Sequence, residues 1–149
     1  MPKSTCGFFI IDQDTQDLFL IHSTRSPWSS WSIPKGGAKD GESPVEAAVR
    51  EVWEESNINL SLINSNNFVT LKPVTYKSKK KTLHAFVYED TGLKKIFNHK
   101  NIFCRSMVKD KKRNIFFPEV DAFQWMNKYD ALNVIHEAQH KALKQYLTK

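Results

Sequence analysis

Long apolar runs and regular repeats are both missing from this chain. No stretch approaches the roughly 18–20 consecutive apolar residues of a membrane-spanning helix. The run CGFFII near the N-terminus is too short for the apolar core of a signal peptide and is followed by acidic and polar residues. No repeat of solenoid or propeller length occurs. We therefore expect a soluble, cytoplasmic protein.

Cysteine, glycine and proline are also scarce. The 149 residues include 2 cysteines, 5 glycines and 6 prolines. Such low glycine and proline contents exclude a fibrous or low-complexity protein. Cys6 and Cys104 lack the spacing of a metal site, and we expect two reduced thiols rather than a disulfide.

The chain does contain enough apolar material for a folded core. Hydrophobic residues make up 40% of it and aromatic residues 12%, which argues against disorder. At this length we expect a single domain over residues 1–149, as a monomer or a homodimer. The 22 Lys and Arg residues against 16 Asp and Glu residues favour a polyanionic partner, which leaves open a phosphorylated small molecule, nucleic acid or a membrane surface.

Segments rich in β-branched and aromatic residues alternate with turn signals. Strands are expected at 6–11 and 18–24, joined as a hairpin, and near 31–33, 68–76, 82–89, 101–108 and 122–126. The stretch DKKRN is typical of a solvated turn between the last two strands. Apolar spacing in the tail predicts a short helix followed by a longer one. With the helix described next, this order predicts an α+β fold, an α/β/α sandwich with a mixed sheet.

A further helix is predicted over Pro44–Ser56. Ser43 can cap its N-terminus, Pro44 suits the first helical position, and Glu46 completes a capping box. Asn57 can adopt the left-handed conformation that ends many helices.

Three carboxylates fall on one stripe of this helix. At about 100° per residue, Glu51, Glu54 and Glu55 lie side by side, next to a stripe of valines that can pack into the core. Like charges at these spacings repel each other. One interpretation is a solvated acidic face. The other is a site for a hard divalent cation, because magnesium or manganese binds carboxylate oxygens and removes the repulsion.

The residues around the helix favour the cation site. Five residues separate Gly36 from Glu42, and seven separate Glu42 from REVWEESNI. This spacing resembles the signature of the Nudix hydrolases; the matching positions are Gly36, Glu42, Arg50, Glu51, Val52, Glu54, Glu55 and Ile58. The departure is Asn57, where the family pattern has glycine, and asparagine adopts positive φ more readily than most residues.

The resemblance implies a Nudix fold and hydrolysis of a nucleoside diphosphate linked to another group, by attack of water on phosphorus. It also implies that Glu51, Glu54, Glu55 and the backbone carbonyl of Gly36 bind the metal. The implied cofactor is Mg²⁺, with Mn²⁺ possible.

The catalytic residues implied by the resemblance are Arg50, Glu54 and Glu119. Arg50 is expected to hold a glutamate in place through its guanidinium fork. Glu54 is a candidate general base within the signature. Glu119 lies in FFPEVDAFQW, a segment that resembles a late acidic loop of these enzymes. A plain loop acid is an equally good interpretation of Glu119.

The substrate is less clearly indicated. WSIPKGG resembles a segment of dinucleoside polyphosphate hydrolases of the asymmetric tetraphosphatase type, and of diphosphoinositol polyphosphate hydrolases. Lys35 in it is expected to meet a phosphate. Tyr76, Lys79 and Lys81 in YKSKKKT are expected to bind a base and a phosphate chain, although a solvated hairpin tip is the simpler interpretation. The leading hypothesis is a dinucleoside polyphosphate such as diadenosine tetraphosphate.

Several alternatives stay open. The same chemistry permits removal of pyrophosphate from the 5′ end of RNA, or a different nucleotide substrate such as ADP-ribose, NADH or a nucleoside triphosphate. A non-catalytic nucleotide-binding module would not need the three helix glutamates. In each case we expect a nucleotide or RNA partner and no membrane partner.

Overall fold

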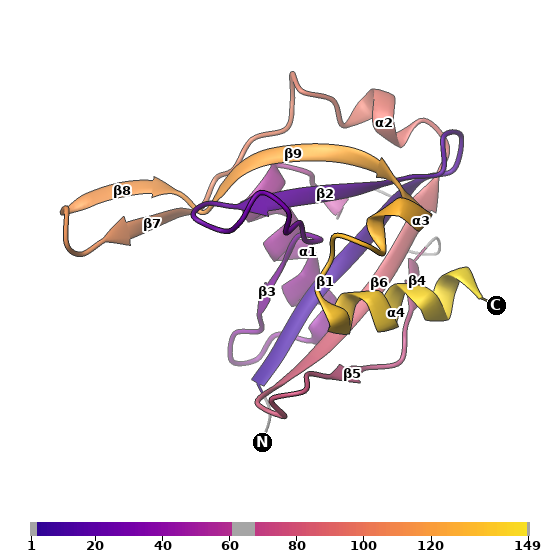
Figure 1. Ribbon diagram of the computed structural model, residues 1–149, viewed down its shortest axis with the longest axis horizontal. Helices are drawn as coiled ribbons and strands as arrows, with labels where there is room; N and C mark the ends of the chain where they lie inside the picture. Colours follow the sequence, from indigo (N-terminus) through magenta and orange to yellow (C-terminus); the bar gives the residue numbers. More distant parts are fainter. Residues whose placement is uncertain (1–2, 61–67, 149) are drawn as a thin grey trace.

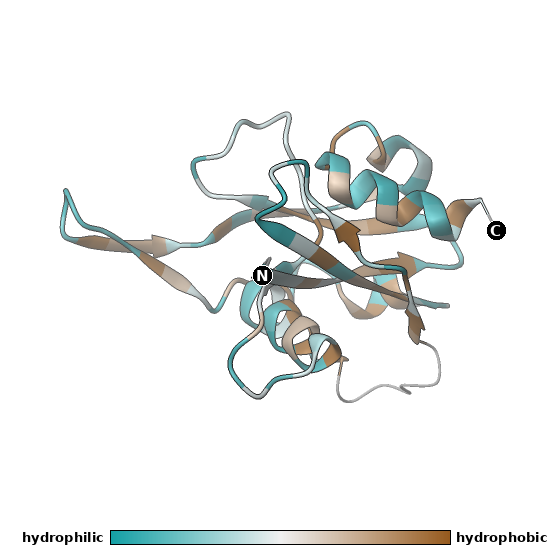
Figure 2. Ribbon diagram, turned by 90° about the horizontal axis from the view of Figure 1, so that it is seen from below, coloured by the Kyte–Doolittle hydropathy of each residue, from teal (hydrophilic) through white to brown (hydrophobic). Residues whose placement is uncertain are grey.

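A mixed sheet lies between two layers of helix (Figure 1). The computed structural model describes residues 3–60 and 68–148, so Met1, Pro2, residues 61–67 and Lys149 of the expected domain lie outside the description. Seen along the sheet, α1 (Pro44–Ser56) covers one face and α4 (Glu137–Leu147) covers the other (Figure 2). The α/β/α sandwich is therefore as predicted from the sequence.

The main sheet contains one parallel pair among antiparallel ones. Its path is β4-β6-β1-β2-β9, with β3 paired to β1 and β5 paired to β6. Strands β1 and β6 are parallel, and the other pairs are antiparallel. The strands are β1 (Lys3–Asp12), β2 (Asp17–Ser23), β3 (Lys35–Gly37), β4 (Phe68–Thr70), β5 (Val74–Thr75), β6 (Lys81–Asp90) and β9 (Val120–Asn127).

The central strand β1 is apolar on both faces because both faces are covered. Phe8 and Ile10 belong to the core cluster on the α1 side, and Phe9 and Ile11 belong to the cluster on the α4 side. All four are fully buried. Successive residues of a strand point to opposite faces, so this one strand joins the two halves of the core.

Strand β3 takes the place beside the first half of β1. Strand β2 pairs with β1 only around Ile11, and β3 pairs with β1 at Cys6 and Gly7. A Cβ on Gly7 would lie 2.6 Å from the carbonyl oxygen of Pro34. Only glycine therefore lets the chain approach β1 so closely, and this approach brings β3 over α1.

Helix α1 begins and ends where the sequence predicts. The Ser43 hydroxyl accepts the N–H of Glu46, and the Glu46 carboxylate accepts the N–H of Ser43, so the capping box is formed. Asn57 ends the helix in the left-handed conformation, with φ 69°. The departure from the glycine of the family pattern is thus compatible with the same backbone turn.

Three predicted strands are wrong in part. Residues 31–33 form a single bridge, between Ser32 and Ile21, and the strand nearby is β3. The expected strand at 68–76 is divided into β4 and β5 around Pro73, which has no N–H for a continuous ladder. Of the expected strand at 101–108, only Met107 and Val108 lie in a strand.

Residues 101–106 do not form a strand because several of their N–H groups bind carbonyl groups at the end of α1. The last carbonyl groups of a helix need donors from outside it. The N–H of Phe103 donates to the Ser56 carbonyl at 3.2 Å, and those of Arg105 and Ser106 donate to the Glu54 carbonyl at 2.7 and 3.1 Å. A segment that caps the helix in this way cannot also pair along its length with the sheet.

A separate two-stranded sheet projects from the sandwich (Figure 1). It consists of β7 (Met107–Asp110) and β8 (Ile115–Pro118). The stretch DKKRN forms the turn between these two strands. The sequence predicted a turn there, but one that leads directly to the strand at 122–126, which is part of β9. We call residues 107–118 the arm.

The remaining elements are short helices. The helix α2 (Leu93–Ile96) is not predicted, whereas α3 (Lys128–Ala131) followed by α4 matches the expected short and longer helices of the tail. Both cysteines are free thiols, as expected. In the part of the chain that the structure describes, no helix is long and apolar enough to span a membrane.

The turn after α1 gives a first testable prediction. The Asn57 side chain donates to the Asn101 carbonyl at 2.9 Å and accepts from Arg105 Nε at 2.8 Å. Asn57→Ala loses both hydrogen bonds and puts at positive φ a residue that adopts it less readily than asparagine, so we expect the free energy of unfolding to fall by about 2 kcal/mol. Asn57→Gly loses the same hydrogen bonds but has no Cβ to strain the left-handed conformation, so it should cost about half as much. Urea denaturation measures both, and equal losses would show that the positive φ contributes nothing.

Candidate active site

Strand β3 passes so close to α1 that one of its positions must be glycine. A Cβ on Gly36 would lie 2.1 Å from the carboxyl carbon of Glu51 and 2.3 Å from each carboxylate oxygen. At Gly37 the nearest atom to such a Cβ would be 3.9 Å away. The Glu51 carboxylate therefore lies against the backbone of β3, in space that Gly36 leaves free.

Arg50 connects the loop before α1 to the carboxylates on the helix. Its Nε and Nη2 donate to the two oxygens of Glu42 at 2.7 and 2.9 Å, a bidentate pair. Its Nη1 donates to Glu51 at 2.9 Å and to both oxygens of Glu54 at 3.2 Å. Nη2 also reaches the Gly37 carbonyl oxygen at 2.8 Å. The arginine was expected to hold one glutamate, and it contacts three as well as β3.

Glu55 is the most buried of the three helix carboxylates, with 4% of the residue exposed. One of its oxygens accepts the N–H of Lys35 at 3.0 Å. Burial raises the pKa of Glu55 to about 8; the Lys35 N–H opposes this effect, and the charges of Glu119 and Glu51 add to it. Burial also raises the pKa of Glu51, although Arg50 opposes it. Ionised carboxylates are costly here, so the site favours an added positive charge.

Glu119 faces the same group of carboxylates from the junction of β8 and β9. Its Oε2 accepts the Ser106 hydroxyl at 2.9 Å, and its N–H donates to the Ser106 carbonyl at 3.1 Å. Its charge contributes to the raised pKa of both Glu51 and Glu55. Glu119 therefore lies close enough to the helix carboxylates to influence their ionisation, and its role at a metal site stays a prediction.

The donor set suits a hard cation, although the side chains are not arranged as ligands. Within residues 3–60 and 68–148, no three His, Cys, Asp or Glu side chains lie close enough together to hold a metal ion. Glu51 and Glu54 turn to the Arg50 guanidinium, and Glu55 turns to the Lys35 N–H. The three carboxylates at the single guanidinium, those of Glu42, Glu51 and Glu54, carry excess negative charge, and oxygen donors are those that Mg²⁺ prefers. Binding requires these side chains to turn away from Arg50.

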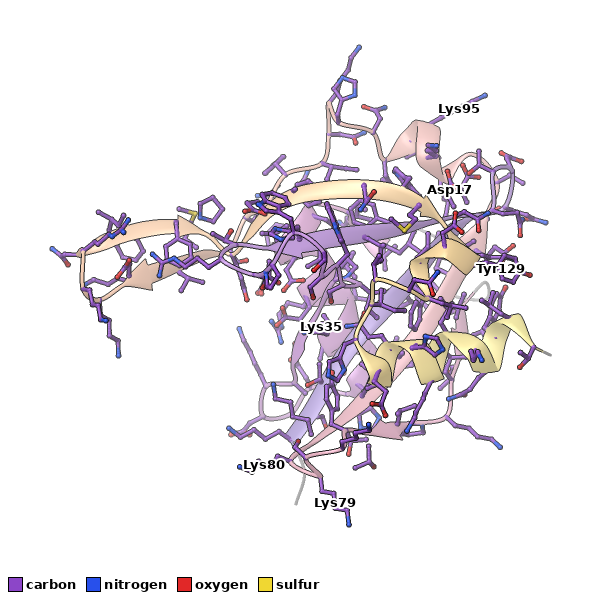
Figure 3. The ribbon with its side chains drawn as sticks, viewed as in Figure 1. Asp17, Lys35, Lys79, Lys80, Lys95 and Tyr129 are labelled. Atoms are coloured by element: carbon purple, nitrogen blue, oxygen red, sulfur yellow. The ribbon has the colours of Figure 1, made fainter. Side chains whose placement is uncertain are left out.

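A cavity of about 390 Å³ begins at Lys35, the residue whose N–H binds Glu55, and is within the size range of ligand pockets. Its lining includes Lys35, Tyr76 and Lys81, three of the four residues expected to bind substrate. Lys79 is not among the lining residues; it lies in the turn before β6 with φ 60°, and Figure 3 shows it at the end of the molecule, away from Lys35. Lys35 connects the carboxylate group to the cavity, because its backbone N–H binds Glu55 and Lys35 also lines the cavity.

Several residues at the site have no clear signal in the sequence. His136 lines the cavity and stacks on Tyr76, with ring centroids 5.1 Å apart. Gln139 accepts the Ile33 N–H and donates to the Ser32 hydroxyl, so α4 holds the loop before β3. Ser106 orients Glu119. Tertiary contacts bring these three residues to the site, and the spacing of residues along the sequence does not predict such contacts.

Comparison with curated proteins finds relatives over part of the chain. An RNA pyrophosphohydrolase of Cereibacter sphaeroides is 45% identical over 79 residues, which cover 51% of this chain and 46% of that protein. The match thus spans about half the length of such curated relatives.

Solved structures match over nearly the whole chain but with low identity, so they support the fold alone. An Ap4A hydrolase of C. elegans in a binary complex superposes with a TM-score of 0.66 and 17% identity, covering 97% of this chain and 96% of that one. The NUDIX domain of Shewanella oneidensis NrtR, complexed with ADP ribose, gives 0.67 and 13%, covering 99% and 88%. The family model described as the NUDIX domain matches residues 1–147. The chain belongs to the NUDIX domain family.

Proposed function

We propose that the protein is a divalent-metal-dependent pyrophosphohydrolase that acts on a nucleoside diphosphate linked to another group. The observation that carries this proposal is a group of partly buried carboxylates that Lys35 connects, through its N–H on Glu55, to a cavity lined by Lys35 and Lys81. Clustered carboxylates suit hard cations, and lysines suit phosphate. Membership of the NUDIX domain family supports the same reaction class.

The residues that would hold the metal are Glu51, Glu54, Glu55 and the backbone carbonyl of Gly36. When bound, Mg²⁺ or Mn²⁺ supplies charge neutralisation to phosphate oxygens and increases the acidity of water. Arg50 would then keep Glu42 and the loop before α1 in place while the helix glutamates turn toward the ion. The raised pKa of Glu55 agrees with a site built for a cation.

Other side chains of the protein would bind the substrate and accept the proton. Lys35 and Lys81 bind phosphate oxygens in the cavity, and Tyr76 with His136 offers an aromatic surface to a base. Glu54 or Glu119 accepts a proton from the attacking water, whose oxygen bonds to phosphorus as the anhydride bond breaks. Ser106 positions Glu119 for that role. The departing phosphate group leaves with the electrons of the broken bond.

Two substrate classes fit this arrangement. The first is a dinucleoside polyphosphate such as diadenosine tetraphosphate, which has a phosphate chain for the lysines and a base for Tyr76. The second is the 5′-polyphosphate end of RNA, which the curated relatives named RNA pyrophosphohydrolase favour. A non-catalytic binding module is disfavoured because all three helix glutamates are present.

A direct assay separates the two classes. The purified protein with Mg²⁺ is incubated with diadenosine tetraphosphate and, separately, with 5′-triphosphorylated RNA, and products are identified by mass. Turnover of at least one class, abolished by chelation of the metal, is expected. Turnover of RNA alone would exclude the dinucleoside polyphosphate, and turnover in excess chelator would exclude the metal-dependent reaction.

Removal of one carboxylate tests whether the acidic residues of α1 take part in catalysis. Glu54→Gln keeps the size of the side chain but removes a charge, so we expect kcat/KM to fall by about a hundredfold or more. The matched control is Glu46→Gln on the first turn of the same helix, where glutamine preserves the capping box. The control should retain full activity. Equal activities for the two variants would remove Glu54 from the mechanism.

The two neighbouring glycines test the position of Glu51 without altering any carboxylate. Gly36→Ala would displace the Glu51 carboxylate, whereas the new methyl group of Gly37→Ala would only make an ordinary contact, 3.9 Å from the Ser4 carbonyl oxygen. We expect Gly36→Ala to abolish the rise in Tm that Mg²⁺ produces and to weaken Mg²⁺ binding by calorimetry about tenfold or more. Gly37→Ala should behave like the parent protein. Unchanged Mg²⁺ binding in Gly36→Ala would contradict the proposed ligand set.

A further inference from the structure

The arm exposes several large apolar side chains to solvent. Phe116 is 65% exposed, Met107 53% and Ile115 47%. The same hairpin carries four cationic residues and one carboxylate: Lys109, Lys111, Lys112, Arg113 and Asp110. Figure 1 shows it extending away from the sandwich, and Figure 2 shows hydrophobic and hydrophilic segments alternating along it. An exposed surface that combines aromatic and cationic groups indicates a binding function.

The strand register separates the arm into two faces. Lys109 pairs with Phe116, so both project from one face. The Lys109 ammonium lies 5.9 Å from the Phe116 ring centroid. This face therefore presents an exposed ring beside a positive charge.

Arg25 packs on part of the opposite face. Its guanidinium lies 4.3 Å above the Phe117 ring and pairs with the Asp110 carboxylate. The hydrogen bond from Arg25 lowers the pKa of Asp110. Arg113 Nε lies 3.9 Å from the same carboxylate. Two arginines therefore share the single carboxylate of the arm, which carries four cationic residues against that one acid.

The base of the arm adjoins the candidate active site. Thr24 donates its N–H to the Glu119 carbonyl at 3.0 Å and its hydroxyl to the Pro118 carbonyl at 2.6 Å. The same loop supplies Arg25 to the arm, and Ser30 and Trp31 to the lining of the lysine cavity. A single loop therefore connects the cavity to the arm.

We propose that the arm binds single-stranded RNA whose 5′ end occupies the cavity. Lys109, Lys111, Lys112 and Arg113 contact backbone phosphates, and Phe116 stacks on a base. A cationic surface with an exposed aromatic side chain is the arrangement that binds single strands without sequence preference. Continuity with a phosphate-binding site favours a nucleic acid over an acidic membrane or a protein, and 5′-polyphosphate ends belong to transcripts. The proposal rests on the proposed function for its substrate end, but binding along the arm can be measured separately.

The size of the arm limits the length of RNA that it contacts. Each strand of the arm has 4 residues, so from its base to the turn the hairpin spans about 13 Å at about 3.3 Å per residue. At about 3.4 Å per stacked nucleotide, this length corresponds to about four nucleotides. Affinity is therefore expected to rise with RNA length up to about four nucleotides along the arm and then to level off.

Binding is tested with fluorescently labelled RNA that carries a 5′-hydroxyl, so that hydrolysis plays no part. The test variant replaces Lys111, Lys112 and Arg113 by glutamine. The control replaces Lys95, Lys100 and Lys144 by glutamine, which changes the net charge equally; Figure 3 shows Lys95 by α2, at the other end of the molecule from the arm. We expect the test variant to bind a 12-nucleotide RNA at least tenfold more weakly in fluorescence anisotropy, and the control to change affinity by less than threefold.

Two further measurements identify the contacts. Loss of three phosphate contacts should reduce the slope of log K against log salt by about two, because each contact to a single strand contributes about 0.7. Phe116→Ser should weaken binding about fivefold or more with the salt slope unchanged, since stacking does not release counterions. Equal weakening by the test and control variants would show that only net charge matters and would overturn the proposal.

Other partners of the arm give distinct results. Binding to vesicles containing anionic lipid but not to RNA would assign the arm to a membrane surface, and a doubled mass in light scattering that Phe116→Ser abolishes would assign it to a second copy of the chain; either result without RNA binding overturns the proposal. RNA binding without hydrolysis of any nucleotide would sink the proposed function and leave the arm assignment intact. Hydrolysis of a nucleotide together with an RNA affinity that the arm variants do not change would support the proposed function and overturn the assignment of the arm.

Discussion

The contact between Glu51 and Gly36 determines how the candidate active site is built. A helix carboxylate can lie against a strand backbone only where the strand has no side chain, and a Cβ at Gly36 would overlap that carboxylate. The strand in turn reaches this position because Gly7 of β1 lets Pro34 approach. Two glycines on neighbouring strands therefore fix the separation between β3 and α1. The positions of Arg50, Glu55 and Lys35 follow from that separation, since each bonds from one of these elements to the other.

The sequence predicts the parts of this arrangement that depend on local chemistry. The capping box and the residue Asn57 define α1 to its last residue, because each signal acts within a few positions along the chain. The spacing from Gly36 to Ile58 identifies the carboxylate helix and its loop. The sheet strands that are apolar on both faces, β1 and β6, are found for the same reason: their composition alone marks them as buried.

Features that depend on distant partners were predicted less well. Residues 101–106 carry strand-like side chains, but the N–H groups of Phe103, Arg105 and Ser106 donate to the open carbonyls at the end of α1. DKKRN forms a turn as predicted, but β8 was not predicted, because the two short strands of the arm are defined only by their pairing with each other. His136 reaches the cavity because α4 packs across the sheet. In each case the deciding interaction joins residues that are far apart in sequence.

The distribution of charge explains how an acidic site fits in a basic protein. Glu51 and Glu55 on α1 are largely buried beside β3, where a bound cation would compensate for the loss of water. Lysines line both the cavity and the arm. Lys35 of β3 connects the two kinds of charge, because its N–H binds Glu55 and the same residue lines the cavity. Under the proposed function, a phosphate chain bound at β3 would lie between the proposed metal ligands and the lysines of the cavity. The basic surface would then bring a polyanion to the acids that, with a bound cation, could act on it.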